Sequence, residues 1–294
     1  MLKNFLKKIR YLIEDFIVRF ALFFFAAIGV KAASNLASAL ARFIGKKLKV
    51  HQLAYQNLSK ALPELSEEKK REVLGEMWDN LGRIVGEFHH ISATPLEKID
   101  EFVNFSAESK ANLEMMKSAG KGGIIVSGHI GNWEIGPKIF LKYGLKVSTV
   151  YRPLNNPYVE KITADLRGVP LIEKGAAGSR KIVETIKEGG FVIILADQKI
   201  SEGEPVQFFH SAATTATSIA RIALKYDIPI IPARSIRHGH QCSFTAEMEK
   251  PLAMQRSGNL NFDILHLTRQ INIKLESWIR EYPAQWFWVH DRWK

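Results

Sequence analysis

The chain has 294 residues, enough for one large α/β domain or two small ones with an ample buried core. Hydrophobic residues make up 46% of the chain and charged residues 24%, which excludes a disordered protein. The single cysteine, Cys242, excludes an internal disulfide framework and is compatible with a reducing compartment.

Basic residues are concentrated at the N-terminus. The first 50 residues hold ten Lys and Arg against Glu14 and Asp15, which leaves a surplus of eight in a chain whose net charge is +11. A basic segment of this kind attracts an anionic surface, either a membrane leaflet or a nucleic acid. The apolar residues between the charges favour the membrane and argue against nucleic-acid binding.

Residues 20–30 form an uncharged, mostly apolar run that contains four Phe residues. A helix that spans a bilayer needs about 20 such residues, and Arg19 and Lys31 bound this run. We therefore expect residues 1–50 to form a membrane-associated region whose helix lies in the bilayer interface. A buried core helix is the alternative.

After this region, Ser66 is a good N-cap for a helix that extends to about residue 90 with one apolar face. Beyond residue 120, short apolar runs alternate with helical segments. Strands are predicted at 124–129, 146–150, 191–197 and 228–233, and helices at 157–166, 179–189, 214–226 and 261–280. This alternation predicts a single α/β domain with a mostly parallel central sheet flanked by helices. Chemistry in such sheets tends to lie at the carboxyl ends of the strands.

The strand at 124–129 ends in His129, and Glu134 follows five residues later. On one continuous helix these side chains would lie about 140° apart. They can meet if His129 ends the strand and Glu134 opens the next helix, with Gly128 and Gly131 in the turn. A carboxylate on one imidazole nitrogen fixes the tautomer and leaves the other nitrogen to accept a proton. Because no nucleophile-elbow serine or cysteine accompanies the pair, we expect it to activate a substrate hydroxyl.

Further motifs follow this pair in a fixed order. They are GHIGNWE at 128–134, YRP at 151–153, RG at 167–168, ADQ at 196–198, FF at 208–209, ATT at 213–215 and QWFWVHDRWK at the C-terminus. As a set they resemble the bacterial lipid A biosynthesis acyltransferases, the late lauroyl and myristoyl transferases. The resemblance covers nearly the whole chain, and the set is specific although no single motif is.

The resemblance implies a His-x4-Asp/Glu acyltransferase fold, with residues 51–294 as the acyltransferase domain, on the cytoplasmic face of the inner membrane. It implies an acyl carrier protein thioester as donor and a hydroxyl of a lipid A precursor as acceptor, within lipopolysaccharide biosynthesis. His129 and Glu134 match the catalytic pair of the family. Arg167 and Asp197 match positions that are functional in the family. Arg152 lies in the Tyr-Arg-Pro motif that follows the catalytic segment.

The residue types agree with this chemistry. Attack of a hydroxyl on a thioester builds negative charge on the carbonyl oxygen, which the backbone N–H groups of Gly131 and Asn132 are expected to stabilise. Arg152 and Arg167 suit bidentate phosphate binding, although ion pairs within the protein are an alternative. Asp197 ends a buried strand and needs a partner there, so an ion pair with Arg167 stands beside a direct catalytic role.

The C-terminus is rich in tryptophan. Four of the six tryptophans lie in the last seventeen residues, where they suit either a membrane interface or the core: Trp278, Trp286, Trp288 and Trp293. His290 and Arg292 are candidates for contact with anionic headgroups. The chain departs from the family pattern at His210, where glycine is common, and at Asp291, where a basic residue is frequent. The first departure affects the loop over the site, and the second weakens phosphate contact.

Other functions remain open. Relatives with the same catalytic pair acylate other membrane lipids, such as phosphatidylinositol mannosides or ornithine lipids. The fold could also serve a non-catalytic membrane-binding protein. A metal-dependent hydrolase is disfavoured, because His89-His90 and the pair His238 and His240 lack a carboxylate-rich ligand set. We expect neither a metal nor an organic cofactor.

Overall fold

The computed structural model describes residues 2–200 and 203–293. Its central sheet has seven strands in the order β1-β9-β8-β2-β5-β3-β4. β9 runs antiparallel to β8, and all other neighbours pair in parallel, which confirms the predicted mostly parallel α/β sheet. The strands are Val103–Phe105 (β1), Gly123–Ser127 (β2), Val147–Tyr151 (β3), Leu171–Glu173 (β4), Phe191–Leu195 (β5), Ile230–Arg237 (β8) and Phe244–Met248 (β9).

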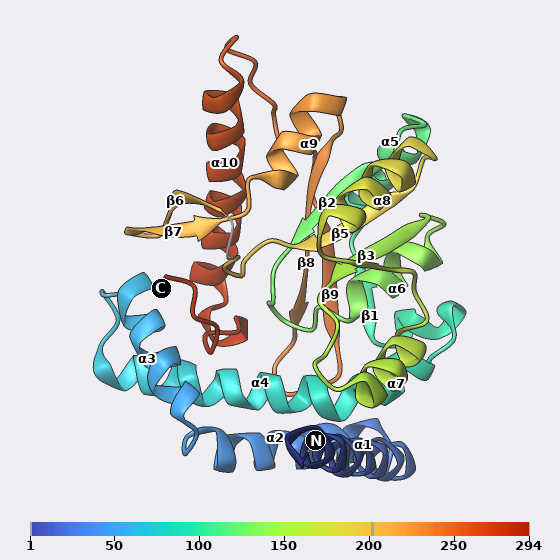
Figure 1. Ribbon diagram of the computed structural model, residues 1–294, viewed down its shortest axis with the longest axis vertical. Helices are drawn as coiled ribbons and strands as arrows, with labels where there is room; N and C mark the ends of the chain where they lie inside the picture. The colour runs from blue at the N-terminus through green and yellow to red at the C-terminus, as the bar shows by residue number, and fades with distance from the viewer. Residues whose placement is uncertain (1, 201–202, 294) are drawn as a thin grey trace.

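Helices cover both faces of the sheet (Figure 1). One face packs against α5 (Ala107–Ser118) and α6 (Ile135–Lys142), and the other against α8 (Ala176–Lys187), α9 (Ser218–Tyr226) and α10 (Leu260–Glu281). In β2, Ile124 and Val126 belong to one buried apolar cluster and Ile125 to the other. The continuous apolar run of this strand is therefore explained by burial on both faces.

A layer of helices lies across the carboxyl ends of the central strands (Figure 1). It consists of α1 (Leu2–Ala27), α2 (Val30–Gly45), α3 (Lys49–Ala61) and α4 (Glu67–Ala93), with α7 (Pro157–Arg167) beside them. α4 begins as predicted, because the Ser66 hydroxyl accepts the Lys69 N–H at 3.2 Å. α1 is tied to α7 by Asn156, whose side-chain amide donates to the Tyr11 carbonyl and to Glu14, both at 2.9 Å.

Glycines allow α2 and α4 to pack with their backbones close together. A Cβ atom on Gly86 would lie 2.4 Å from the Ala33 carbonyl oxygen, and one on Gly82 would lie 2.5 Å from that of Ala37. No larger residue fits at these two positions unless the helices separate. The N-terminal region is therefore seated directly on the helix that borders the rest of the domain.

Several element boundaries differ from the predictions. The strand expected at 228–233 spans Ile230–Arg237, and the strand expected at 191–197 ends at Leu195. The helix expected at 214–226 begins at Ser218, because residues 204–208 (β6) and 211–215 (β7) form a two-stranded antiparallel hairpin. Ser179 lies inside α8 and does not cap it, since the helix begins after Gly175, whose φ is 139°. α3 begins at Lys49, next to the position where the sequence suggested that the N-terminal region ends.

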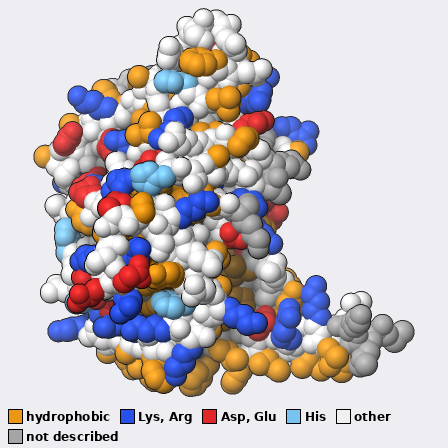
Figure 2. Space-filling model, turned by 90° about the vertical axis from the view of Figure 1, so that its left-hand side faces the viewer, with side chains coloured by type: hydrophobic (Ala, Val, Ile, Leu, Met, Phe, Trp, Pro, Cys, Tyr) orange, Lys and Arg blue, Asp and Glu red, His pale blue; other side chains and the backbone are white. Residues whose placement is uncertain are grey.

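Within the described part of the chain, no helix combines the length and the hydropathy needed to cross a bilayer. The exposed faces of α1 and α2 are nevertheless rich in large apolar side chains. Phe5, Phe16 and Phe23 of α1 are 62%, 70% and 74% exposed, and Phe43 of α2 is 67% exposed. Figure 2 shows hydrophobic side chains gathered along the lower edge of the molecule, where Figure 1 places α1 and α2, with Lys and Arg above them.

The close packing of α2 on α4 makes a prediction about two glycines of α4. Gly86→Ala is expected to lower the free energy of unfolding by about 1–3 kcal/mol, because its methyl group meets the Ala33 carbonyl. Gly75→Ala meets nothing within 4 Å and is expected to raise that free energy by about 0.5–1 kcal/mol. Urea titrations followed by circular dichroism measure both. Equal effects of the two substitutions would contradict the packing described.

Candidate active site

His129 and Asp197 lie side by side because they follow neighbouring parallel strands. β2 pairs with β5 in a register that places Ser127 opposite Leu195, and each of the two residues follows its strand by two positions. His129 Nδ1 lies 2.8 Å from Asp197 Oδ1, and the His129 backbone N–H donates to Oδ2 at 2.7 Å. The pair thus stands at the carboxyl ends of two central strands, where chemistry was predicted.

The Asp197 carboxylate is buried, with 1% of the residue exposed, and Trp286 Nε1 donates a third hydrogen bond to it at 2.8 Å. Burial alone raises the pKa of this carboxyl, but the His129 imidazole and the hydrogen bonds from His129 and Trp286 lower it to about 2. The carboxylate therefore stays ionised and favours a proton on Nδ1 of His129. The Gln198 side-chain amide contacts Nε2 at 3.3 Å.

Glu134 is bound to Arg167. Arg167 Nε and Nη2 each donate to one Glu134 oxygen at 2.9 Å, which is a bidentate ion pair between the start of α6 and the end of α7. This corrects the expectation that Glu134 orients His129. The alternative in which Asp197 pairs with Arg167 is not the one found, because the Asp197 oxygens bind His129 and Trp286. The strand register brings Asp197 to the imidazole, while the turn before α6 directs Glu134 to α7.

His129, Glu134 and Arg167 line a cavity of about 320 Å³. Arg152, predicted as a phosphate ligand, and Gln198 lie on its wall as well. Apolar side chains form another part of the wall: Trp133, Pro137, Val150, Leu154, Val169, Leu171, Ile193 and Leu195. A cavity with both cationic and apolar walls suits an amphiphilic ligand.

Gly131 and Asn132 are buried behind this cavity. The Gly131 N–H donates to the Gln285 carbonyl at 3.1 Å, so it is not available to a developing oxyanion as expected. Glycine is required there, because φ is 59° and a Cβ atom would lie 1.8 Å from the Ser235 carbonyl oxygen. Asn132 is fully buried, and its side chain takes part in the hydrogen bonds that hold the loop.

Lys138 is a wall residue that the sequence did not reveal. Its ammonium group donates to the carbonyls of Ile91, Ser92 and Thr94, at 2.7, 2.5 and 2.7 Å. Burial lowers the pKa of Lys138. The lysine joins α6 to the end of α4, where carbonyl groups lack partners within the helix. No motif predicts this contact, since all three acceptors are backbone atoms.

The tryptophans of the C-terminal segment that enter the core are Trp278, Trp286 and Trp288, which are 3%, 2% and 0% exposed. Packing in the core therefore explains these three tryptophans. They are too buried to lie at a membrane interface, which was the alternative. Arg292 is buried too, and it donates to the Thr214 carbonyl at 2.8 Å. Arg292 is therefore no longer a candidate for headgroup contact, because the β6–β7 hairpin encloses its guanidinium.

The remaining histidines of the family motifs also have protein partners. His290 Nε2 accepts the Lys199 backbone N–H at 2.8 Å, and burial lowers the pKa of His290. His210, which stands where glycine is common, is exposed at the turn of the β6–β7 hairpin and lies 3.4 Å from Arg280 Nη2. The hairpin accommodates this departure because the positive φ of 54° falls on Phe209.

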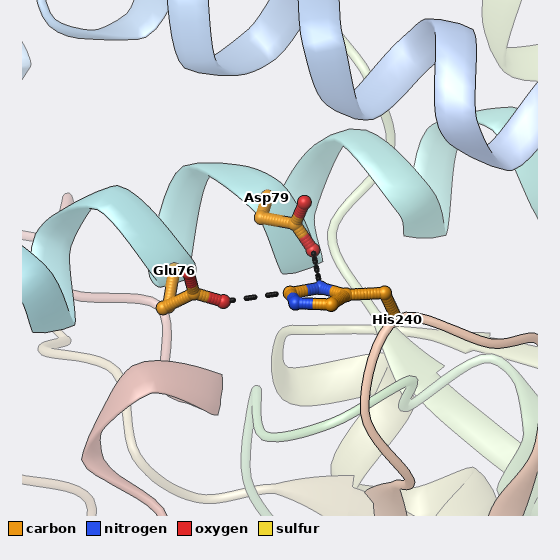
Figure 3. A group of neighbouring side chains, drawn as sticks. All are labelled: Glu76, Asp79 and His240. Carbon is orange, nitrogen blue, oxygen red and sulfur yellow. Dashed lines mark hydrogen bonds and ion pairs between the residues drawn. The ribbon is translucent and has the colours of Figure 1, made fainter.

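Glu76, Asp79 and His240 have the spacing of metal ligands, the one such group found among the residues described (Figure 3). His240 thus has carboxylates beside it that the sequence did not predict. Asp79, however, already accepts Arg83 Nε at 2.6 Å, the Ser38 hydroxyl and His240 Nδ1. An ion-pair network between α2, α4 and the turn after β8 explains this group without a metal.

The family of bacterial lipid A biosynthesis acyltransferases matches the chain over residues 2–294. A lipid A biosynthesis acyltransferase of Haemophilus influenzae is 24% identical over 284 residues, which cover 92% of this chain and 84% of that protein. A lipid A biosynthesis palmitoleoyltransferase of Escherichia coli is 25% identical over 254 residues, 82% of this chain and 78% of that protein. A lipid A biosynthesis myristoyltransferase of Escherichia coli is 22% identical over 255 residues, 85% and 77% of the two chains. This chain belongs to the bacterial lipid A biosynthesis acyltransferases.

Proposed function

We propose that this protein transfers a fatty acyl chain from an acyl carrier protein thioester to a hydroxyl group of a lipid A precursor, at the cytoplasmic face of the inner membrane. Membership of the family supports acyl transfer in lipid A biosynthesis. The observation that carries the chemistry is the pair of His129 and Asp197, beside a cavity with cationic and apolar walls.

His129 is the general base in this proposal. Asp197 holds the proton on Nδ1, so Nε2 takes the proton of the acceptor hydroxyl as its oxygen attacks the thioester carbonyl carbon. The C–S bond then breaks, and the leaving thiolate takes the proton from His129. The products are an ester and a free thiol, and the histidine returns to its starting state.

Glu134 and Arg167 serve the acceptor in this proposal. Arg167 and Arg152 both line the cavity, and a guanidinium binds a phosphate group of the acceptor in bidentate fashion. Glu134 holds the Arg167 guanidinium in a fixed orientation through two hydrogen bonds. Glu134 therefore contributes by orienting Arg167, while Asp197 orients the base.

The helices α1 and α2 are proposed to hold the site at the bilayer. Their exposed apolar faces and neighbouring Lys and Arg side chains are typical of helices that lie in the interface. The contacts of Asn156 with α1 place α7, which ends in Arg167, next to that surface. A lipid acceptor then reaches the cavity without leaving the membrane surface.

The first prediction concerns the base. His129→Ala removes the proton acceptor. Asp197→Asn removes the carboxylate that keeps the imidazole proton on Nδ1. Each substitution is expected to lower kcat on the order of 10⁴-fold. Transfer of a labelled acyl group from the carrier protein thioester to a lipid A precursor in detergent measures this. Asp165→Asn, an exposed carboxylate of α7, is the control and retains activity.

Two outcomes would change the proposal. Full activity of Asp197→Asn would remove Asp197 from the mechanism. Consumption of the thioester by the wild type without transfer to the precursor would keep the donor and point to another lipid acceptor. No consumption of the thioester by the folded protein would exclude the donor.

The second prediction concerns phosphate recognition. Arg167→Lys is expected to raise the KM of the acceptor about tenfold, because a lysine cannot form two parallel hydrogen bonds with phosphate. The KM of the donor should stay unchanged. An acceptor from which the phosphates have been removed should be used equally by the wild type and the variant. A loss of the same size on that acceptor would contradict a phosphate role for Arg167.

The third prediction concerns the membrane. Replacing Phe5, Phe16 and Phe23 by serine is expected to weaken binding to phospholipid vesicles on the order of a hundredfold, because three exposed rings no longer enter the interface. Vesicle sedimentation measures the bound fraction. The matched control replaces three exposed apolar residues at the start of α10: Leu260, Phe262 and Leu265. Equal weakening by both triple substitutions would argue against binding through α1.

A further inference from the structure

The loop at residues 130–134, which leads to Glu134, is held from behind by Asn132. The Asn132 side-chain oxygen accepts the Glu134 backbone N–H at 3.2 Å. The backbone carbonyl oxygen of Asn132 accepts the Ser235 hydroxyl of β8 at 2.6 Å. The remaining group of this side chain, Nδ2, donates to Glu87 of α4 at 3.2 Å. The backbone position of Glu134 is thereby linked to a carboxylate that lies outside the cavity.

Glu87 is fully buried, and its two oxygens accept hydrogen bonds from three elements. Arg237 of β8 donates from Nη1 at 2.6 Å and from Nη2 at 2.8 Å. Ser34 of α2 donates its hydroxyl at 2.8 Å, and Asn132 completes the set. A buried carboxylate is stable only when all its hydrogen-bond partners are in place. The loss of one partner therefore alters the hydrogen bonds to the remaining partners.

The hydrogen bond from Ser34 connects this set to the helix with the exposed apolar face. Ser34 is 2% exposed, and it faces α4 at the point where Gly86 lets the two backbones approach. Ser38 lies one turn further along α2 and donates instead to Asp79. That carboxylate is bound to Arg83 and His240. Because Arg83 Nη1 also donates to Ser34 Oγ at 3.1 Å, Ser38 is connected to Glu87 only indirectly, whereas Ser34 contacts Glu87 directly.

We propose that Glu87 is a positioning residue for acyl transfer. Through Ser34, this positioning depends on how α2 packs against α4. The proposal rests on the function proposed above. When α2 moves, Glu87 and Asn132 loosen, and Glu134 no longer presents Arg167 in one orientation. His129 and Asp197 stay paired meanwhile, because β2 and β5 hold them independently. The rate of acyl transfer thus depends on the packing of α2, the helix that we propose lies at the membrane, against α4.

Two alanine substitutions on α2 test this link. Ser34→Ala removes the direct bond to Glu87 together with an acceptor of Arg83 Nη1. Ser38→Ala removes a comparable buried bond to Asp79 on the same helix and leaves the direct contact with Glu87 in place. Both are expected to lower the thermal midpoint by similar amounts. Ser34→Ala is expected to lower kcat roughly fivefold at unchanged KM of the donor, whereas Ser38→Ala leaves kcat unchanged. Asn132→Ala cuts the link at the loop and lowers kcat about a hundredfold.

Hydrogen exchange of the Glu134 amide gives a readout that needs no turnover. Ser34→Ala and Asn132→Ala are expected to speed this exchange, and Ser38→Ala to leave it unchanged. The same pattern in a protein that shows no transfer would preserve the link while removing the proposed function. Equal losses of kcat in both serine variants, or an unchanged exchange rate in Ser34→Ala, would overturn the link even where transfer by the wild type is established.

Discussion

The buried carboxylate of Asp197 is the constraint on which the site depends. An ionised group with so little exposure is stable only if its oxygens are fully hydrogen-bonded, and here the donors are two groups of His129 and the indole of Trp286. The His129 donors require that β2 and β5 be neighbours in one register. The indole requires that the segment after α10 return to the strand ends, where Ile130 and Trp286 form a bridge.

Three carboxylates around the loop after β2 have separate partners. Asp197 holds an imidazole, Glu134 holds the Arg167 guanidinium, and Glu87 holds the loop between them through Asn132. Each charge is matched by a specific donor set, which limits exchange of partners. This separation explains why a histidine and a glutamate close in sequence do not contact each other, although both line one cavity.

Much of the fold could be predicted from the sequence, because it depends on local periodicity. The apolar run at 191–195 and the glycine-led run before His129 indicate buried strands, and Ser66 marks the start of α4. Strand order is not local, however. Nothing in the sequence places β2 next to β5, and without that neighbourhood Asp197 has no evident partner. Arg167 was found through its motif, but its pairing with Glu134 depends on how the end of α7 lies beside the start of α6. Lys138 and Glu87 were missed because their partners are backbone atoms or lie far away in the chain.

The position of Trp286 in the chain has a consequence for synthesis. The indole that completes the partners of Asp197 is made after every strand of the sheet, whereas α1 and α2 are made before these strands. Domains acquire structure progressively as a chain leaves the ribosome. The apolar face of α1 is thus complete while the Asp197 carboxylate still lacks one of its donors. Under the proposed function, a growing chain could therefore bind the membrane surface before it is able to transfer an acyl group there.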